Sequence, residues 1–474
     1  MFQESTPGFN SRQDPRVEVD ESGWTFLIEN LVCKRLFAEN YSSPKELMLS
    51  SPNRSTLALI EPTPNVPFFR PQLSELEIHE VVETLRSGWL TTGPQVNEFE
   101  REFSKAVNAQ YAVALNSCTA ALHLAAEAIG LCENQGVLVP SMTFAATAEI
   151  VLYKGAIPIL VDCDSVTGNI DLNDAEEKIK QIRDGSLNPA VPADIEIVGI
   201  IPVHVGGHML DVVKVKEFAS RHGLWIIEDA AHAFPAAWRP DSTSPFQYCG
   251  ENTADVTCFS FYANKTITTG EGGMAVTNNR KLADRIRLLS LHGLSHDAWG
   301  RYSGKGNWDY KIVAPGYKYN LTDIAASIGR GQLLRAEEMR RRRQAIAEFY
   351  TDSFSNVLEF ELPPVCGDRI HSWHLFPIRL NLQSLTIDRD TFVQELKQNG
   401  VGCSVHWRPL HLHPLYRRFG WKAGDLPVAS SMWRRLISLP LFSAMSAKES
   451  AHVVETVKRI SAQHTARKLF LVAS

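Results

Sequence analysis

The chain has 474 residues, of which 44% are hydrophobic and 21% are charged, and its formal net charge is −5. These fractions are typical of a globular protein, and the small negative charge argues against nucleic acid or an anionic membrane as the main partner. The length suggests two or three domains.

Cysteine usage and the apolar runs predict a cytoplasmic protein. The eight cysteines stand singly, none in a Cys-x-x-Cys pair, and several lie in apolar strands, which is typical of buried, reduced thiols and gives no support for a metal site. The longest apolar runs are too short to span a bilayer, and the first residues have no basic region followed by an apolar core, as a secretory signal would.

Three regions follow one another along the chain. Residues 1–65 mix polar, Pro- and Ser-containing stretches with one apolar patch, and we predict a partly disordered extension. Residues 66–330 alternate strand-like and helix-like segments, which predicts a large α/β domain around a mainly parallel sheet. Residues 331–474 are expected to form a smaller α+β domain.

In the large domain the expected strands are continuous apolar runs, typical of strands buried on both faces. They cover residues 109–117, 136–142, 157–163, 195–204, 224–229 and 256–262. Helices are expected between them at 119–130 and 144–156 and after them at 279–293.

The small domain is expected to begin with one long helix over 331–354. Its run Arg340–Arg343 is most simply the solvated face of an amphipathic helix. A strand over 371–380, a helix over 388–400 and a strand over 401–407 are expected to follow.

Polar side chains follow several of the predicted strands. In open α/β sheets, ligands bind beyond the carboxyl ends of the strands, so these side chains are candidates for one site. Taken singly, each has an ordinary explanation: a helix cap, a core aromatic or a surface lysine. The candidates are Ser117, Thr119, Phe144, Asp229, His232, Ser260 and Lys265.

Together these residues meet the needs of pyridoxal phosphate (PLP). A lysine amine such as that of Lys265 can form a Schiff base with this cofactor. Asp229 can keep the pyridine nitrogen protonated, and Phe144 can cover the ring. Ser117, Thr119 and Ser260 can form a phosphate cup at a helix start. A hydride-transfer enzyme of Rossmann type is not favoured, because the sequence has no G-x-G-x-x-G motif.

Seven ordered blocks of sequence resemble the DegT-type (DegT/DnrJ/StrS) PLP-dependent aminotransferases, over roughly residues 66–460. The resemblance implies the fold of aspartate aminotransferase (fold type I) and a homodimer with the active site at the subunit interface. The blocks are "SGWLTTGPQVNEFEREF", "NSCTAALHLA", "VPSMTFAATAEIVLYKGAIPILVD", "EDAAHA", "FSFYANKTITTGEGGMAVT", "APGYKYNLTDIAASIG" and "VHWRPLHLHPLY".

By this resemblance Lys265 is the Schiff-base lysine and Asp229 is the partner of the pyridine nitrogen. Phe144 matches the position that stacks on the ring, and His232 matches a position beside the cofactor. The phosphate cup would consist of Thr119, Ser260 and the backbone N–H of Cys118, which stands where members usually carry glycine.

The loop 316–320, "GYKYN", would reach the phosphate bound in the neighbouring subunit. Members often have Gly-Tyr-Asn-Tyr-Arg there, whereas this chain has Lys318 and Asn320. The resemblance leaves open which of these two side chains makes the contact.

The family transfers an amino group, with glutamate as the expected donor, to nucleotide-linked keto sugars for amino-sugar and polysaccharide biosynthesis. The nucleotide and the choice between C3 and C4 are not readable from the sequence. A PLP-dependent sugar dehydratase is the alternative function, although such relatives replace the lysine with histidine. A non-catalytic regulator is a further alternative.

His406 and residues 411–416 lie where members form the sugar-nucleotide entrance, and a metal site there is a minor alternative.

Overall fold

A computed structural model describes residues 64–466, apart from 190, 193 and 295–310. All structure described here lies within Pro62–Ser474. The predicted extension over 1–65 therefore lies almost wholly outside the described residues. In the described part of the chain, no helix is both long and apolar enough to cross a membrane.

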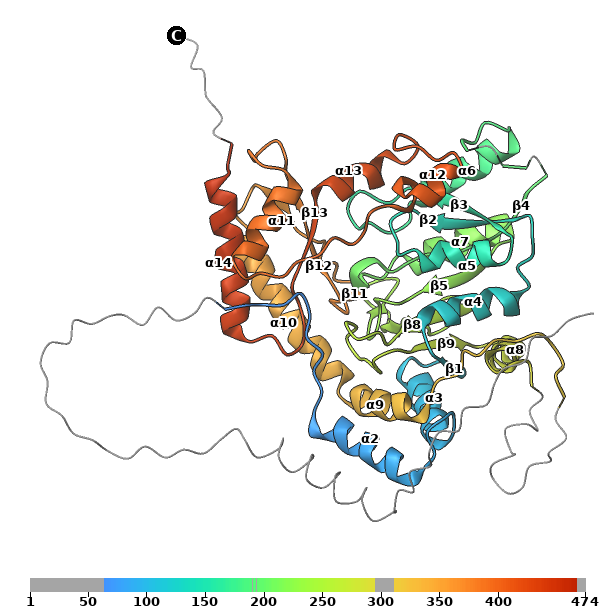
Figure 1. The fold of residues 1–474 in the computed structure, drawn as a ribbon. Helices are drawn as coiled ribbons and strands as arrows, with labels where there is room; N and C mark the ends of the chain where they lie inside the picture. Colours follow the sequence, from blue (N-terminus) through green and yellow to red (C-terminus); the bar gives the residue numbers. More distant parts are fainter. Residues whose placement is uncertain (1–63, 190, 193, 295–310, 467–474) are drawn as a thin grey trace, which may run out of the picture. The chain divides into compact units, whose positions relative to one another are not determined.

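A mixed, mainly parallel sheet of seven strands forms the centre of the fold (Figure 1). Its order is β1-β9-β8-β5-β4-β2-β3. Only β9 runs against its neighbours, pairing antiparallel with β1 and β8. The predicted fold class is thus confirmed. The strands are β1 (Tyr111–Leu115), β2 (Gln135–Pro140), β3 (Ile157–Val161), β4 (Glu196–Ile200), β5 (Trp225–Asp229), β8 (Val256–Ser260) and β9 (Gly273–Thr277).

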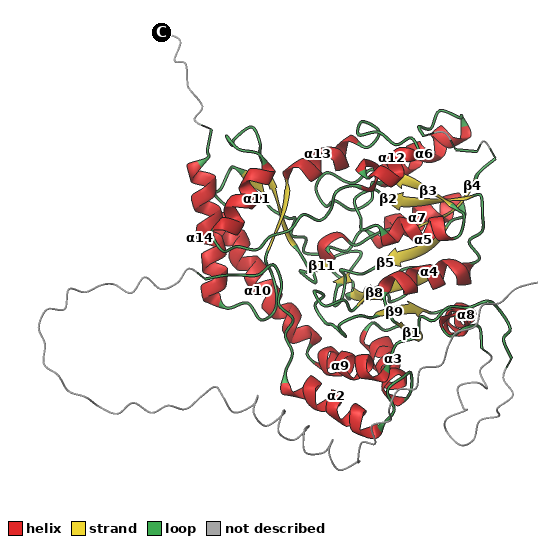
Figure 2. Ribbon diagram, viewed as in Figure 1, coloured by secondary structure: helices red, strands yellow, loops and turns green. Residues whose placement is uncertain are grey.

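Helices cover both faces of this sheet (Figure 2). Successive strand side chains point to opposite faces, so Ile226 belongs to one hydrophobic core and Ile227 to the other. The first core takes in α3 (Pro94–Ala106), α6 (Leu172–Arg183) and α7 (Val212–His222), and the second takes in α4 (Cys118–Ile129), α5 (Ala146–Tyr153) and α8 (Arg280–Ser290).

The predicted long helix over 331–354 is wrong in two respects. It begins earlier, as α9 (Asp323–Leu334), and it breaks at Arg335 before α10 (Ala336–Phe354). The break lies where Arg335 pairs with Glu77 of α2 (Glu75–Ser87), at 3.2 Å between Nη1 and Oε1. The interpretation of Arg340–Arg343 as a solvated face is also only half right, because Arg340 and Arg343 are 8% and 3% exposed.

A second sheet, β10 (Phe360–Glu361), β12 (Phe376–Leu380) and β13 (Leu436–Leu439), is antiparallel throughout. It shares a core with α10, α11 (Arg389–Gln398) and α14 (Ala447–Gln463). The boundary between the predicted large and small domains stays a prediction.

The expected strand over 401–407 is wrong, because this segment makes only single-residue bridges, Val66↔Val401 and Ser404↔Ser438. Gly402 lies so close to the chain beside it that a Cβ there would be 2.6 Å from the backbone nitrogen of Phe68. The segment is therefore packed as an irregular connection.

The remaining described elements are β6 (Ala237–Trp238), β7 (Gln247–Tyr248), β11 (Arg369–Ile370), α12 (Pro414–Arg418), α13 (Pro427–Arg435) and the 3₁₀ turns Val205–Gly207 and Leu410–Leu412.

Asp323, the first residue of α9, connects this helix to the start of α3. Its buried carboxylate accepts hydrogen bonds from the backbone N–H groups of Gly93, Gln95 and Val96, at 2.8, 3.1 and 3.0 Å. We predict that Asp323→Ala lowers the free energy of unfolding by about 1–3 kcal/mol, because it leaves buried donors unpaired. Urea unfolding measures the change. Asp284→Ala on the exposed side of α8 is the matched control, and an equal effect of both variants would contradict the interpretation.

Candidate active site

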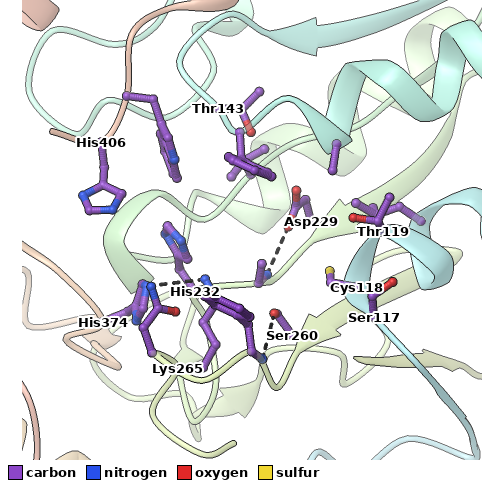
Figure 3. Close-up of a pocket in the computed structure, with 18 of the residues that line it drawn as sticks. Ser117, Cys118, Thr119, Thr143, Asp229, His232, Ser260, Lys265, His374 and His406 are labelled. Carbon is purple, nitrogen blue, oxygen red and sulfur yellow. Dashed lines mark hydrogen bonds between the residues drawn. The ribbon is translucent and has the colours of Figure 1, made fainter. Parts of the chain in front are cut away.

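A cavity of about 460 Å³ opens at the carboxyl ends of the central strands. Lys265 points into it from the segment after β8, Asp229 from the last residue of β5 and His232 from the segment after β5. The start of α4 faces them (Figure 3). The structure thus brings together most of the residues that the sequence singled out. Those on the cavity wall are Ser117, Cys118, Thr119, Phe144, Asp229, His232, Ser260 and Lys265.

Lys265 lies five residues after the end of β8, in a turn closed by its own N–H donating to the carbonyl of Tyr262. Burial lowers the pKa of its amine to about 8, because a charged ammonium loses its hydration there, and the carboxylate of Asp229 partly opposes this shift. Near physiological pH a minority of the amine is therefore neutral, although far more than of an ordinary lysine. Its Nζ lies 3.4 Å from Nε2 of His374.

Asp229 is the last residue of β5 and is 5% exposed. Its Oδ2 accepts a hydrogen bond from the hydroxyl of Thr147 at 2.8 Å, and its Oδ1 accepts one from the N–H of Ala231 at 3.1 Å. Burial raises the pKa of the carboxyl, while these hydrogen bonds and Lys265 act in the opposite direction. A cationic group beside Asp229 would offset the cost of burying its charge.

The start of α4 forms the opposite end of the cavity. Ser117 is an ordinary N-cap, since its Oγ accepts from the N–H of Ala120 at 3.1 Å. The N–H groups of Cys118 and Thr119 belong to the first turn, whose donors have no acceptor inside a helix, and this suits an anion. Ser260 places its hydroxyl on the same wall, where it accepts from the N–H of Tyr262 at 3.3 Å.

Gly273, the first residue of β9, lies directly behind this helix start. A Cβ at that position would be 2.4 Å from the carbonyl of Ser117 and 2.5 Å from the nitrogen of Cys118. Only glycine lets the strand approach so closely. The glycines after Lys265 therefore set the position of the helix start as well as forming a turn.

Phe144 lies four residues after the end of the buried strand β2 and is 63% exposed. This exposure is unusual for a large aromatic side chain so close to a buried strand. The ordinary expectation for a single phenylalanine is a place in the core. Its ring instead borders the cavity, where it is available to cover a flat ligand.

Three neutral histidines and one tryptophan line the remaining wall. The ring of His232 is stacked on Trp407, with centroids 5.1 Å apart, and lies 4.1 Å from the ring of His374. Burial lowers the pKa of His232 and His374 well below the usual value and that of His406 to about 4, so all three are neutral at pH 7. His374 and Trp407 gave no signal in the sequence, because His374 fell inside one expected strand and Trp407 was the last residue of another.

Lys318 and Asn320 do not line the cavity. Lys318 is exposed, and its Nζ donates to Oδ1 of Asn320 at 2.6 Å. The N–H of Asn116, two residues before α4, donates a hydrogen bond of 2.8 Å to the carbonyl of Tyr319 and so connects their loop to the start of that helix. The expected contact with a neighbouring subunit stays a prediction.

The histidines of the predicted entrance segment are engaged in hydrogen bonds. His411 is buried, with Nδ1 2.7 Å from the hydroxyl of Ser141 and Nε2 2.8 Å from that of Ser430. Nδ1 of His406 lies 3.0 Å from the hydroxyl of Ser438. Among the described residues, His204, Glu228 and Cys249 have ligand atoms within 4.8 Å of one another, but Glu228 already accepts from Thr253 and Thr257.

The donor set fits PLP. A buried amine can hold the aldehyde carbon, a buried carboxylate can face a protonated ring nitrogen, and the first turn of a helix can bind the phosphate. Cys118 and Thr119, the first two residues of that helix, both line the cavity. The exposed ring of Phe144 supplies an aromatic surface.

Comparison with known proteins agrees with this fit. The model of the DegT/DnrJ/EryC1/StrS aminotransferase family matches residues 71–458. An uncharacterized protein of Methanocaldococcus jannaschii, MJ1066, is 42% identical over 400 residues, which are 84% of this chain and 98% of that protein. The spore coat polysaccharide biosynthesis protein SpsC of Bacillus subtilis is 40% identical over 397 residues, covering 83% and 97%.

Among solved structures, the putative sugar aminotransferase Spr1654 of Streptococcus pneumoniae in its PMP form has a TM-score of 0.75 and 32% identity. The match covers 84% of this chain and all of that one. Its PLP form matches with a TM-score of 0.74.

The lowered pKa of Lys265 predicts unusual reactivity toward amine reagents. At pH 8 about half of this amine is unprotonated, whereas an ordinary lysine with a pKa of about 10.4 is almost fully charged. We expect labelling of Lys265 in the full-length, cofactor-free chain to rise with pH through a midpoint near 8. Mass spectrometry of the labelled peptide gives the midpoint, with a blocked lysine amide as the reference. A midpoint equal to that of the reference would contradict the assigned burial.

Proposed function

The chain belongs to the DegT/DnrJ/EryC1/StrS aminotransferase family, and we propose that it transfers the amino group of L-glutamate to a nucleotide-linked keto sugar, with Lys265 as the anchoring and proton-transferring base. It is a PLP-dependent sugar aminotransferase, as its family and its structural neighbours are. The observation that carries the proposed residue roles is the meeting of Lys265, Asp229 and the start of α4 in one cavity.

PLP, when bound, supplies the electron sink that makes a proton on the adjoining amino-acid carbon removable. Lys265 would hold the cofactor covalently before the reaction and would act as the base once released. Burial raises the neutral fraction of the Nζ amine far above that of an ordinary lysine, and this neutral fraction can take a proton near neutral pH without first losing one.

Asp229 would maintain the electron sink by pairing with the protonated ring nitrogen. Thr147 and the N–H of Ala231 hold the two carboxylate oxygens, which fixes the orientation of the side chain. Cys118 and Thr119 would bind the phosphate through their backbone N–H groups, and Ser260 and the side chain of Thr119 through their hydroxyls. Phe144 would cover the ring.

His232 and His406 lie on the far side of Lys265 from the start of α4 (Figure 3), and Trp407, which stacks on His232, completes this wall of the cavity. We assign this wall to the substrates, because neutral imidazoles donate and accept hydrogen bonds, and sugar hydroxyls need both. The relative SpsC is named for polysaccharide biosynthesis, which supports an amino sugar for a polysaccharide as the product. We expect the enzyme to work in the cytoplasm.

We also propose a homodimer in which the loop 316–320 completes the phosphate site of the other subunit. Lys318 supports this, since it is an exposed cation beside the start of α4, held in place by Asn320. A dehydratase is less well supported, because Lys265 is present and the neighbours are aminotransferases.

Replacing Lys265 tests the proposed anchor. We predict that Lys265→Ala lacks the visible absorbance band of a lysine-bound cofactor, while Lys214→Ala, on the exposed side of α7, keeps it. Glutamate should bleach or shift the band of the unaltered enzyme. Retention of a reducible lysine–cofactor linkage in Lys265→Ala would show that the assignment is wrong.

Replacing Asp229 tests the electron sink separately. Asp229→Asn has the same shape and keeps an oxygen for Thr147, so we expect the cofactor still to bind. Amino transfer should slow by a factor on the order of 10²–10³, as for the loss of other pre-organised electrostatic partners. Single-turnover absorbance changes with glutamate measure this rate. An unaltered rate would contradict the role given to the carboxylate.

The acceptor is identified by product analysis. The enzyme is incubated with glutamate and a panel of UDP-, dTDP- and GDP-linked 3-keto and 4-keto hexoses, and the products are separated by mass. We expect one nucleotide sugar in the panel to gain an amino group with release of 2-oxoglutarate. Amination of free keto acids alone would contradict the sugar assignment.

A further inference from the structure

The side chain of His374 contacts the amine of Lys265. Neither a sequence motif nor a predicted strand end had indicated a role for this histidine. Its Nε2 lies 3.4 Å from Nζ of Lys265, across 109 residues of sequence (Figure 3). The imidazole is 5% exposed and lines the same cavity. A buried polar ring therefore contacts the atom that the proposed reaction depends on.

The other ring nitrogen of His374 is left without a partner. Nδ1 is buried and has no hydrogen bond to any described residue. In most buried histidines a partner at the second nitrogen decides which nitrogen carries the proton. Here nothing in the described part of the chain fixes the tautomer, so Nε2 is free to act as an acceptor toward Nζ.

The position of the ring is built by the backbone on both sides of it. Trp373 has φ of 50°, a left-handed conformation that is rare for a bulky residue. Its carbonyl accepts a hydrogen bond of 3.2 Å from Nη1 of Arg343, which also donates to the carbonyl of Leu441 at 2.9 Å. On the other side of the ring, the N–H of Leu375 donates to the carbonyl of Gly206 at 3.1 Å.

Arg343 makes this connection without a carboxylate partner among the described residues. It is 3% exposed, and its recorded hydrogen bonds go to the two carbonyls. Burying a guanidinium in this way costs free energy, so we expect the arginine to have a structural or functional role at this position. The carbonyl of Trp373 adjoins His374 in the chain, and fixing that carbonyl fixes the direction of the imidazole.

We propose that His374 is a further catalytic residue of this site, accepting a hydrogen bond at Nε2 from Nζ of Lys265, and that Arg343 is its positioning residue. When the released amine takes a proton from the substrate carbon, Nζ becomes an ammonium with three N–H bonds. One of them points to Nε2, while another returns its proton to carbon. The imidazole stays neutral throughout, so no further acid or oxidant is needed.

This inference rests on the proposed role of Lys265, but its test does not need the cofactor. The charged and titratable groups around the pair are Asp229 and Cys118 beside Lys265, His232 and His406 beside His374, and Arg343 beside both. Because Nε2 accepts from the ammonium, it stabilises the charged form of Lys265. Removing it should therefore lower the pKa of Lys265 further.

The experiment measures the pH midpoint of Lys265 labelling in full-length, cofactor-free variants. His374→Phe, which keeps the ring shape but has no acceptor, should shift the midpoint down by about one pH unit, since one unit corresponds to 1.36 kcal/mol. His374→Gln, which has an amide near the place of Nε2, should restore most of the shift. His222→Phe, far from the site on α7, should leave the midpoint unchanged.

An upward shift in His374→Phe would mean that the imidazole is charged and repels Lys265, which overturns the inference. An unchanged midpoint would mean that His374 does not accept a hydrogen bond from Lys265 and only fills space beside it. Arg343→Lys keeps the positive charge that itself lowers the pKa of Lys265 but loses the guanidinium that binds both carbonyls. It should shift the midpoint in the same direction as His374→Phe, and an unchanged midpoint would show that Arg343 does not position His374. These outcomes are separate from the absorbance of Lys265→Ala, which decides the proposed function.

Discussion

The desolvation of one lysine amine is the constraint on which the site depends. An ammonium that loses its water is destabilised unless anions or hydrogen-bond acceptors replace it. Around Lys265 the replacement is incomplete, since Asp229 attracts the charge and neutral histidines surround it, and the pKa falls to about 8. The amine is consequently reactive at neutral pH, which an exposed lysine is not.

The sheet explains how this amine and its partners meet. Parallel strands β5 and β8 end at the same edge, so the residues that follow them share one space. Asp229 and Lys265 come from these two ends, and α4 begins opposite them because Gly273 lets β9 approach its first turn. The second sheet and its helices add His374 and the segment around His406. The end of the cavity proposed for the phosphate is thus built by the central sheet, and the end proposed for the substrates by residues far along the chain.

The residues at the ends of the central strands were predictable from the sequence, whereas His374 and its supports were not. Asp229 and Lys265 stand at the ends of long apolar runs, and such runs make strand ends visible without any knowledge of packing. His374 gave no such signal, because its place depends on the left-handed backbone at Trp373 and on Arg343. The arginine run that contains Arg343 was interpreted as solvated, since composition does not show which face of a helix the tertiary structure covers.

The central claim is that the amine of Lys265 carries the cofactor. The most direct measurement is reduction of the loaded, full-length enzyme with borohydride, which converts a lysine–cofactor linkage into a stable bond, followed by peptide mapping by mass spectrometry. The account predicts the added cofactor mass on the peptide that contains Lys265. A modified peptide from any other lysine, with the Lys265 peptide unmodified, would contradict it.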